Sequence, residues 1–159
     1  MSKVEVNVRE AYGFYLNLIN LITSVDEKGK PNVMTGAWAV QFSVNPPLFG
    51  ILISPKTYSY ELITKTREFV VNVPTKDIEE KVTFCGSCSG RTVDKFKETG
   101  LTAVPAKRVK APWIKECIIH LECKLTDTKP YGDHTLLVGE VLMAYVDKEA
   151  FNKEKLILL

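Results

Sequence analysis

Apolar and polar residues alternate along CIIHLECKL, residues 117–125, with the period of two that is typical of a β-strand with one buried face. The positions that would share the buried face are Cys117, Ile119, Leu121, Cys123 and Leu125, and those opposite are Ile118, His120, Glu122 and Lys124. The pattern predicts two long strands, at 118–128 and 135–146, joined by the turn KPYGDH.

The chain before these strands is also rich in short apolar runs, which are interrupted by turn residues and by three helix candidates. Residues 18–54 predict two or three strands, with a hairpin turn at 26–30 around Gly29. Further elements are expected as follows: strands at 48–53 and 69–73, helices at 57–69, 77–84 with Asp77 as its cap, and 92–99 ending at Gly100, and a crossing loop at 101–114.

Length and composition fit a single domain that spans residues 1–159. Of the 159 residues, 45% are hydrophobic and 25% charged, which suits one compact core and leaves no room for a second domain. Long strands with few devices to protect their edges favour a sheet that closes on itself. We therefore expect a mainly β, antiparallel barrel with short inserted helices.

Charge and targeting patterns exclude several classes of partner. The 21 basic and 19 acidic residues give a net charge of +2, so no global field gathers nucleic acid or an anionic membrane. No apolar run is long enough for a membrane span, and the first 25 residues do not resemble a signal peptide. With 4 cysteines and no export signal, the cytoplasm is the expected compartment.

The spacing Cys85-Gly86-Ser87-Cys88 is used both by zinc sites and by redox-active dithiols. Cys117 and Cys123 do not complete a zinc site, because six residues along a strand place them about 20 Å apart. We interpret these two as core residues. A zinc or dithiol module at Cys85 and Cys88 remains a minor alternative, and a lowered thiol pKa would make the dithiol form reactive.

The most informative stretch for chemistry is ISPKTYSYELI, where an apolar strand leads into a helix. Ser54, Lys56, Thr57 and Ser59 would surround the unpaired N–H groups at the helix start, an arrangement that suits a phosphate. The alternative is an ordinary helix start, with Thr57 as the N-cap and Lys56 in solvent.

A second group of the same kind follows in SCSGR. Ser89 and Gly90 can present donors in a tight turn, and Arg91 can bind a phosphate with two parallel hydrogen bonds. We expect this turn at a second helix start near Thr92. Two such groups in a small domain indicate one phosphorylated ligand held from two sides.

A third element, NVMTGAW at residues 32–38, suits a planar ligand. Gly36 allows close approach to the backbone, and Trp38 offers a face for stacking. The alternative is a glycine bulge beside a core tryptophan.

The order NVMTGAW, NPPLFGILISPKTYSYELI, FVVNVP, FCGSCSGRTVDKF and GDHTLLVGEV resembles the flavin reductase-like, FMN-binding split-barrel family, and within it the flavoredoxin and ferric reductase branch. The resemblance implies a six-stranded antiparallel Greek-key split barrel that forms a homodimer, with FMN near the dimer interface. It implies cofactor contacts from Asn32, Met34, Thr35, Gly36, Ala37, Trp38, Ser54, Lys56, Thr57, Ser59, Asn72, Val73, Cys85, Ser89, Arg91, Lys95 and His134.

The activity implied by the resemblance is hydride transfer from NAD(P)H to FMN, followed by electron transfer to free flavin, ferric iron or a protein acceptor. No G-x-G-x-x-G follows a predicted strand, so reduced nicotinamide is expected to bind only transiently. His134 would lie at the barrel rim as the catalytic residue. The alternative is a flavoredoxin-type electron-transfer protein with no nicotinamide activity of its own.

Overall fold

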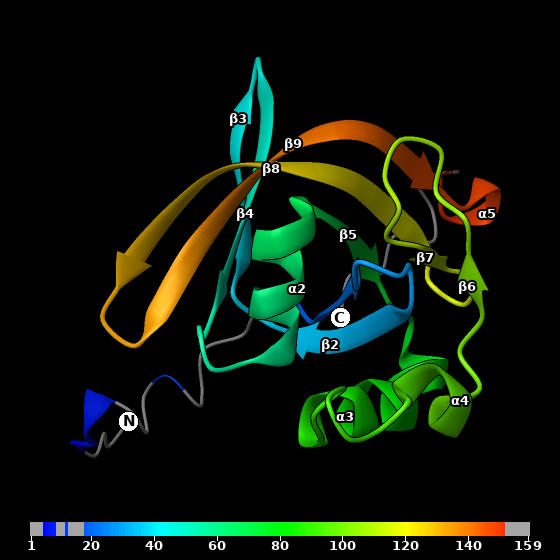
Figure 1. The fold of residues 1–159 in the computed structure, drawn as a ribbon, viewed down its shortest axis with the longest axis horizontal. Helices are drawn as coiled ribbons and strands as arrows, with labels where there is room; N and C mark the ends of the chain where they lie inside the picture. Colours follow the sequence, from blue (N-terminus) through cyan, green and yellow to red (C-terminus); the bar gives the residue numbers. More distant parts are fainter. Residues whose placement is uncertain (1–4, 9–11, 13–17, 152–159) are drawn as a thin grey trace, which may run out of the picture.

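The fold is built on a seven-stranded antiparallel sheet. In the computed structural model, which describes residues 5–8, 12 and 18–151, the strand order is β2-β1-β5-β8-β9-β4-β3. The strands are β1 (Asn20–Val25), β2 (Pro31–Gly36), β3 (Ala39–Val44), β4 (Pro47–Ile53), β5 (Glu68–Val73), β8 (Ile119–Tyr131) and β9 (His134–Val146). The sheet curves around α2 (Tyr58–Thr66), as Figure 1 shows.

The mainly β, antiparallel fold class is confirmed, but the expected number of six strands is wrong by one. Residues 18–54 form four strands, β1 to β4, whereas two or three were expected. Asn45 and Pro46 make a tight connection between β3 and β4, which pair with each other. The sheet is also not continuously closed, since β2 and β3 stand at the two ends of the strand order. The gap between these ends makes the barrel a split one.

The helices pack on both faces of the curved sheet. On the inner face, Ile63 of α2 joins a buried cluster with Ile22, Phe69 and Leu137. On the outer face, two helices contribute Val82 and other side chains to a second buried cluster. These are α3 (Glu79–Ser87) and α4 (Lys95–Thr99), which lie side by side in Figure 1.

Two predicted helix starts require correction. The helix predicted at 77–84 begins with a 3₁₀ turn, η1 (Lys76–Ile78). Asp77 therefore lies inside this turn and does not cap the helix. The third helix begins at Lys95, where the Asp94 side chain accepts a hydrogen bond from the Lys97 N–H. It ends at Gly100 as predicted, in a left-handed conformation with φ of 63°.

The crossing segment 101–114 is more ordered than a loop. It contains β6 (Ala103–Val104) and β7 (Trp113–Ile114), which pair with each other. Short α5 (Lys148–Phe151) follows β9. The crossing segment covers the outer face of the sheet next to β5 and β8, and this cover changes the environment of that face.

Because of this cover, the prediction that His120 and Glu122 face solvent is wrong. His120 is 4% exposed and Glu122 is fully buried. The Glu122 carboxylate accepts hydrogen bonds from the backbone N–H groups of Lys107 (3.0 Å) and Arg108 (2.6 Å), and the His120 ring contacts the Trp113 ring in a tilted arrangement. Cys117 precedes the strand but is buried, as predicted, and Cys123 is buried within it.

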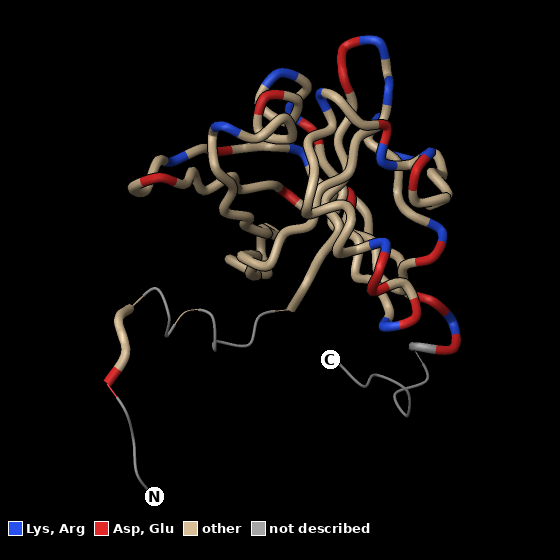
Figure 2. Tube along the Cα trace, turned by 90° about the horizontal axis from the view of Figure 1, so that it is seen from below, with Lys and Arg blue, Asp and Glu red and all other residues tan. Residues whose placement is uncertain are grey.

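Charged residues of both signs are spread over the surface. In Figure 2 lysine and arginine are interspersed with aspartate and glutamate along the peripheral turns. Among the described residues, no helix has the length and apolar character needed to cross a bilayer.

Candidate cofactor pocket

A cavity of about 330 Å³ lies between β2, the start of α2, the end of α3 and the turn that follows α3. This space is large enough to receive part of a small organic ligand. The lining residues are Met34, Thr35, Lys56, Thr57, Tyr58, Ser59, Cys85, Gly86, Ser87, Cys88, Ser89, Gly90, Arg91 and Lys95.

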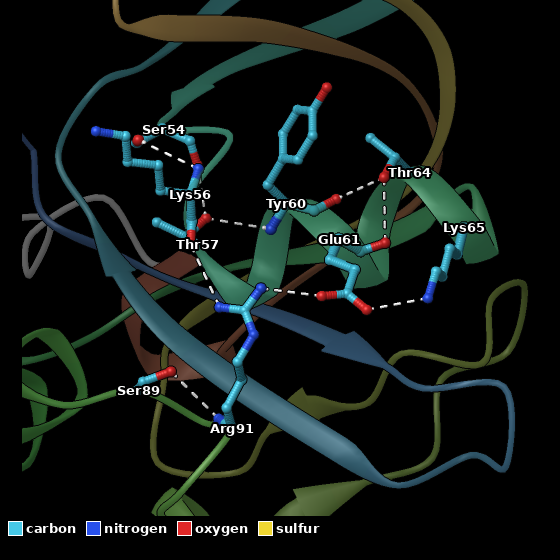
Figure 3. Close-up of polar contacts among 9 residues, drawn as sticks. All are labelled: Ser54, Lys56, Thr57, Tyr60, Glu61, Thr64, Lys65, Ser89 and Arg91. Atoms are coloured by element: carbon cyan, nitrogen blue, oxygen red, sulfur yellow. Dashed lines mark hydrogen bonds and ion pairs between the residues drawn. The ribbon is translucent and has the colours of Figure 1, made fainter.

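The start of α2 forms one wall, and Thr57 caps it. The Thr57 hydroxyl accepts from the Tyr60 N–H at 3.2 Å and donates to the Ser54 carbonyl at 2.9 Å (Figure 3). The ordinary N-cap that was the alternative interpretation is therefore present. It does not exclude an anion site, because the first N–H groups of the helix still point outward beside the Lys56 side chain.

The turn Ser89–Arg91 forms the opposite wall, but it does not stand at a helix start as predicted. α3 ends at Ser87 and α4 begins four residues after Arg91, so the turn connects the two helices. The Ser89 hydroxyl accepts from the Arg91 N–H at 3.3 Å, and its carbonyl accepts from the N–H groups of Thr92 and Val93. The predicted second contribution from a helix dipole is thus absent, and Arg91 supplies the charge here.

Arg91 joins the two walls. Its guanidinium donates to the Lys56 carbonyl at 3.3 Å and to the Glu61 carboxylate at 2.9 Å (Figure 3). It also lies over the Tyr58 ring, 5.2 Å from the ring centroid. The hydrogen bond from Lys65 is the main cause of a lowered pKa at Glu61, and the hydrogen bond from Arg91 adds to it. Lys65 offsets the charge of Glu61, so a net positive charge remains at this end of the cavity.

Asn32 links the start of α2 to the Ser89–Arg91 turn. Its side-chain amide donates to the Ser59 hydroxyl at 2.9 Å, and both residues are buried. A Cβ atom added to Gly90 would lie 1.9 Å from Asn32 Oδ1, so only glycine allows the turn to pack this closely. Asn32 and Ser59 therefore position the anion-binding end, although Ser59 is also a lining residue.

Lys95 and the two cysteines form the remaining wall. The Lys95 side chain is 5% exposed and its ammonium donates to the Cys85 carbonyl at 2.6 Å. Burial lowers the pKa of Lys95 and raises the pKa of the Cys85 thiol to about 11. The expected lowering of a cysteine pKa is therefore wrong for Cys85, which lies in the last turn of α3 and not at a helix start.

Zinc binding at this cysteine pair gains no support from its surroundings. Within the part of the chain that the structure describes, no group of three or more His, Cys, Asp and Glu side chains could hold a metal ion.

Trp38 and His134 meet at a separate place, beyond the cavity lining. Their ring centroids are 4.5 Å apart, and the His134 Nδ1 lies 2.8 Å from an Asp133 carboxylate oxygen. The hydrogen bond with His134 is the main cause of a lowered pKa at Asp133, and the charge of Lys56 contributes. Since Lys56 also lines the cavity, this rim group lies close to its cationic end.

Other predicted site residues lie outside the cavity lining. Gly36 ends β2, Ala37 follows it, and Ser54 holds the loop before α2. Asn72 is fully buried on the outer face, where its amide donates to the Leu21 carbonyl and its oxygen accepts from the Ile114 N–H. Its neighbour Val73 is also buried. Neither Asn72 nor Val73 reaches the cavity.

The prediction left out several lining residues: Tyr58, Gly86, Ser87, Cys88 and Gly90. Tyr58 follows the capping threonine directly, and Gly90 lies inside the SGR turn, so both could have been included from their position in the motifs. Gly86, Ser87 and Cys88 line the cavity only because α3 ends there.

Comparison with known proteins places the chain in a family. Residues 13–159 match the flavin reductase like domain, and the chain belongs to that family. An uncharacterized protein of Archaeoglobus fulgidus is 42% identical over 142 residues, which cover 89% of this chain and 78% of the relative. An uncharacterized protein of Pyrococcus abyssi is 42% identical over 124 residues, covering 78% and 71%.

Solved structures agree with this assignment. Flavoredoxin of Desulfovibrio vulgaris (Miyazaki F) has a TM-score of 0.80 at 30% identity, and the match covers 85% of this chain and 72% of the flavoredoxin chain. An FMN-binding protein of Thermus thermophilus gives 0.81 at 26% identity, covering 95% and 82%. A Shewanella frigidimarina protein with a split barrel domain gives 0.82 at 25%, covering 91% and 77%. The chain is thus a flavin reductase-like protein with a split-barrel fold.

Proposed function

We propose that this chain binds FMN in the cavity and works as an oxidoreductase that takes electrons from NAD(P)H. The observation that carries the proposal is the arrangement of one cationic, hydrogen-bonding end beside Lys56 and Arg91 and a wall of β2 residues next to it. FMN would supply two-electron redox chemistry, and its phosphate and flat ring match these two parts.

The anion-binding end is the part of the cavity that recognises a phosphate. Lys56, Thr57, Ser89 and Arg91 all line the cavity, so a phosphate there would accept hydrogen bonds from their side chains and from the first N–H groups of α2. The Glu61 carboxylate keeps the Arg91 guanidinium over the Tyr58 ring, so little side-chain freedom is lost when a phosphate binds.

The ring end is bounded by β2 and by the connection to β3. Met34 and Thr35 line the cavity, and the Thr35 hydroxyl is fixed by a 2.5 Å hydrogen bond to the Val82 carbonyl. Gly36, Ala37 and Trp38 follow in sequence toward the rim. We propose that these residues flank the flat part of the ligand, with Lys95 and Cys85 facing them.

His134 is proposed to contact the electron donor, NAD(P)H, at the rim of the barrel. Its Nδ1 is engaged by Asp133 and its ring is supported by Trp38, so Nε2 is the nitrogen left for a substrate. Free flavin, ferric iron and a protein are the proposed classes of electron acceptor. The similarity to a flavoredoxin favours a second candidate, an electron-transfer protein without nicotinamide activity.

Two titrations test the proposal. Protein freed of cofactor should bind FMN more tightly than riboflavin, and Arg91→Ala should weaken FMN by about 1.5–3 kcal/mol while leaving riboflavin unchanged. Lys97→Ala is the control, because Lys97 is exposed on α4 and does not line the cavity. Equal affinity for FMN and riboflavin would contradict the phosphate assignment.

Anaerobic mixing with NADH or NADPH separates the two candidate activities. Loss of the visible absorption of bound flavin indicates nicotinamide oxidation, and an unchanged spectrum that still responds to dithionite indicates an electron-transfer protein.

A homodimer is also proposed, on the basis of β3. This strand is at one end of the sheet order, and its outward side chains Val40, Phe42 and Val44 are 53%, 50% and 91% exposed. Such a row of apolar side chains on an edge strand favours association with a second copy. Sedimentation of the wild type and of Val44→Lys should show a dimer that the substitution weakens. The expected cytoplasmic location stays a proposal, supported by four free cysteines.

A further inference from the structure

Cys85 and Cys88 both line the cavity, although the proposed function uses neither as a reacting group. Cys85 lies in the last turn of α3, and Cys88 is the C-cap with extended backbone angles of φ −136° and ψ 165°. Since the chain leaves the helix at Cys88, the Cys88 side chain is not confined to a helical direction. Residues three apart at a helix end are also close in space.

The environments of the two thiols differ. Cys85 is 1% exposed within the outer cluster, whereas Cys88 is partly exposed and its S–H points to the Phe84 carbonyl at 3.5 Å. The two cysteines are three residues apart at the end of α3 and line the same cavity. An accessible thiol beside a sheltered one is the arrangement that thiol–disulfide exchange requires.

A buried cation lies next to both thiols. The Lys95 ammonium has three N–H donors, of which one reaches the Cys85 carbonyl at 2.6 Å. Both cysteines affect the pKa of Lys95, and its side chain lines the same cavity. A positive charge at this place stabilises a thiolate when it forms.

We propose that Cys85 and Cys88 form a thiol–disulfide exchange site for small disulfides that enter the cavity, with Cys88 as the attacking and Cys85 as the resolving residue. The Cys88 thiolate attacks one sulfur of a disulfide RSSR, forms the mixed disulfide Cys88–S–S–R and releases RS⁻. Cys85 then loses its proton to water and attacks the Cys88 sulfur, which releases the second RS⁻. The protein loses two electrons and two protons, and two RSH molecules carry them away.

This half-reaction goes beyond the proposed function and uses no flavin as a reactant. Because FMN is proposed for the same cavity, the exchange is measured both on the protein as purified and after removal of FMN. The other two cysteines provide an internal comparison. Cys117 and Cys123 are both buried, and burial raises the pKa of the Cys117 thiol to about 12. Neither lines the cavity, and no exchange is expected at either of them.

Trypsin places the two cysteine pairs on separate peptides, which makes the test direct. Cleavage after Lys81 and Arg91 gives a peptide 82–91 with Cys85 and Cys88, and cleavage after Lys115 and Lys124 gives 116–124 with Cys117 and Cys123. The purified protein is treated with an excess of glutathione disulfide, quenched with acid, alkylated and digested. We expect peptide 82–91 to become about 2 Da lighter and to resist alkylation, while 116–124 takes two alkyl groups.

Three variants assign the roles of the residues. Cys85→Ser should accumulate a glutathione adduct on Cys88, about 305 Da heavier, because the resolving thiol is gone. Cys88→Ser should leave peptide 82–91 unmodified. Lys95→Met should slow the exchange about tenfold, whereas Lys97→Met, an exposed lysine on the same helix, should not.

The proposal is overturned if peptide 82–91 stays fully alkylated in excess glutathione disulfide, or if 116–124 is oxidised to the same extent. A glutathione adduct that forms equally well on Cys85 in the Cys88→Ser protein would also overturn it.

Discussion

The cavity and the outer face of the sheet each contain buried polar side chains, but they use them in opposite ways. We call the second group the outer-face network: Asn72, His120 and Glu122, with the Trp113 ring in contact with His120. In this network the polar atoms are satisfied within the protein, such as Asn72 by Leu21 and Ile114. At the cavity, the Lys95 ammonium has three donors and, within the described part of the chain, one hydrogen-bond partner, the Cys85 carbonyl.

The comparison shows that burial of a polar residue does not by itself indicate a binding site. The outer-face network fixes the crossing segment over β5 and β8, because Glu122 holds the backbone of Lys107 and Arg108. The Thr23 hydroxyl donates to the Pro112 carbonyl in the same region. Substitutions in this network should therefore change stability, and substitutions at the cavity should change ligand binding.

The largest effect is expected for Glu122→Ala. The substitution removes a fully buried side chain that accepts from the N–H groups of Lys107 and Arg108, and leaves a cavity in its place. It should lower the free energy of unfolding by about 3–5 kcal/mol. Glu116→Ala is the matched control, since Glu116 also accepts from a backbone N–H, that of Thr102, but at an exposed place. Water replaces that partner, so a loss of about 1 kcal/mol is expected. Urea denaturation measures both, and equal losses would remove the distinction between the two regions.

His120 should make the stability depend on pH. Burial lowers its pKa to about 4, from an ordinary value of 6.5. Between these values the unfolded chain binds a proton that the folded protein does not, so stability falls as pH falls from about 6.5 to about 4, by up to about 3 kcal/mol. Compared with wild type, His120→Gln should lose this part of the pH dependence.

The second histidine serves as the control for this measurement. His134→Ala should keep the pH dependence of stability seen in the wild type, because His134 lies at the rim and not in the outer-face network. If His134→Ala removes the dependence and His120→Gln does not, the assignment of His120 is wrong.

Gly90→Ala should act on the cavity more than on stability. The added Cβ would clash with Asn32 Oδ1 and force the Ser89–Arg91 turn away from α2, with an expected loss of FMN affinity of about 30-fold. Gly139→Ala is the comparison, because its Cβ would also clash, at 2.7 Å from the Phe69 ring, but outside the cavity lining, so it should lower stability without this loss of FMN affinity. Unchanged FMN binding in Gly90→Ala would show that the turn does not contribute to the site.

The smallest effect is expected at the rim. His134→Ala should retain near-normal FMN occupancy but slow the anaerobic reduction by NAD(P)H about tenfold, the lower edge of what a positioned polar group contributes. Stopped-flow mixing at several pH values measures this rate. If His134→Ala is reduced at the wild-type rate throughout pH 6 to 8, His134 is structural. If the variant loses FMN completely, His134 is a cofactor anchor.

Local features of the sequence determined most of the elements and one side of the site. The Asp26–Lys30 turn, the Thr57 cap and the end of the third helix at Gly100 each depend on a few neighbouring residues, and all three were predicted. Met34, Lys56 and Arg91 were likewise selected from motifs and do line one cavity. Conformational preferences within a turn of the chain are readable from the sequence because they need no distant partner.

Only the tertiary structure decided which faces are covered and which polar groups remain available. The alternation around His120 and Glu122 predicted an exposed face, and the crossing segment, which is far away in the sequence from β5, buried it. The same cover takes Asn72 away from the site. At Cys85 the exact end of α3 and the packing around it decided the thiol environment. Burial depends on which distant segments meet, and a local pattern of apolar and polar residues does not contain that information.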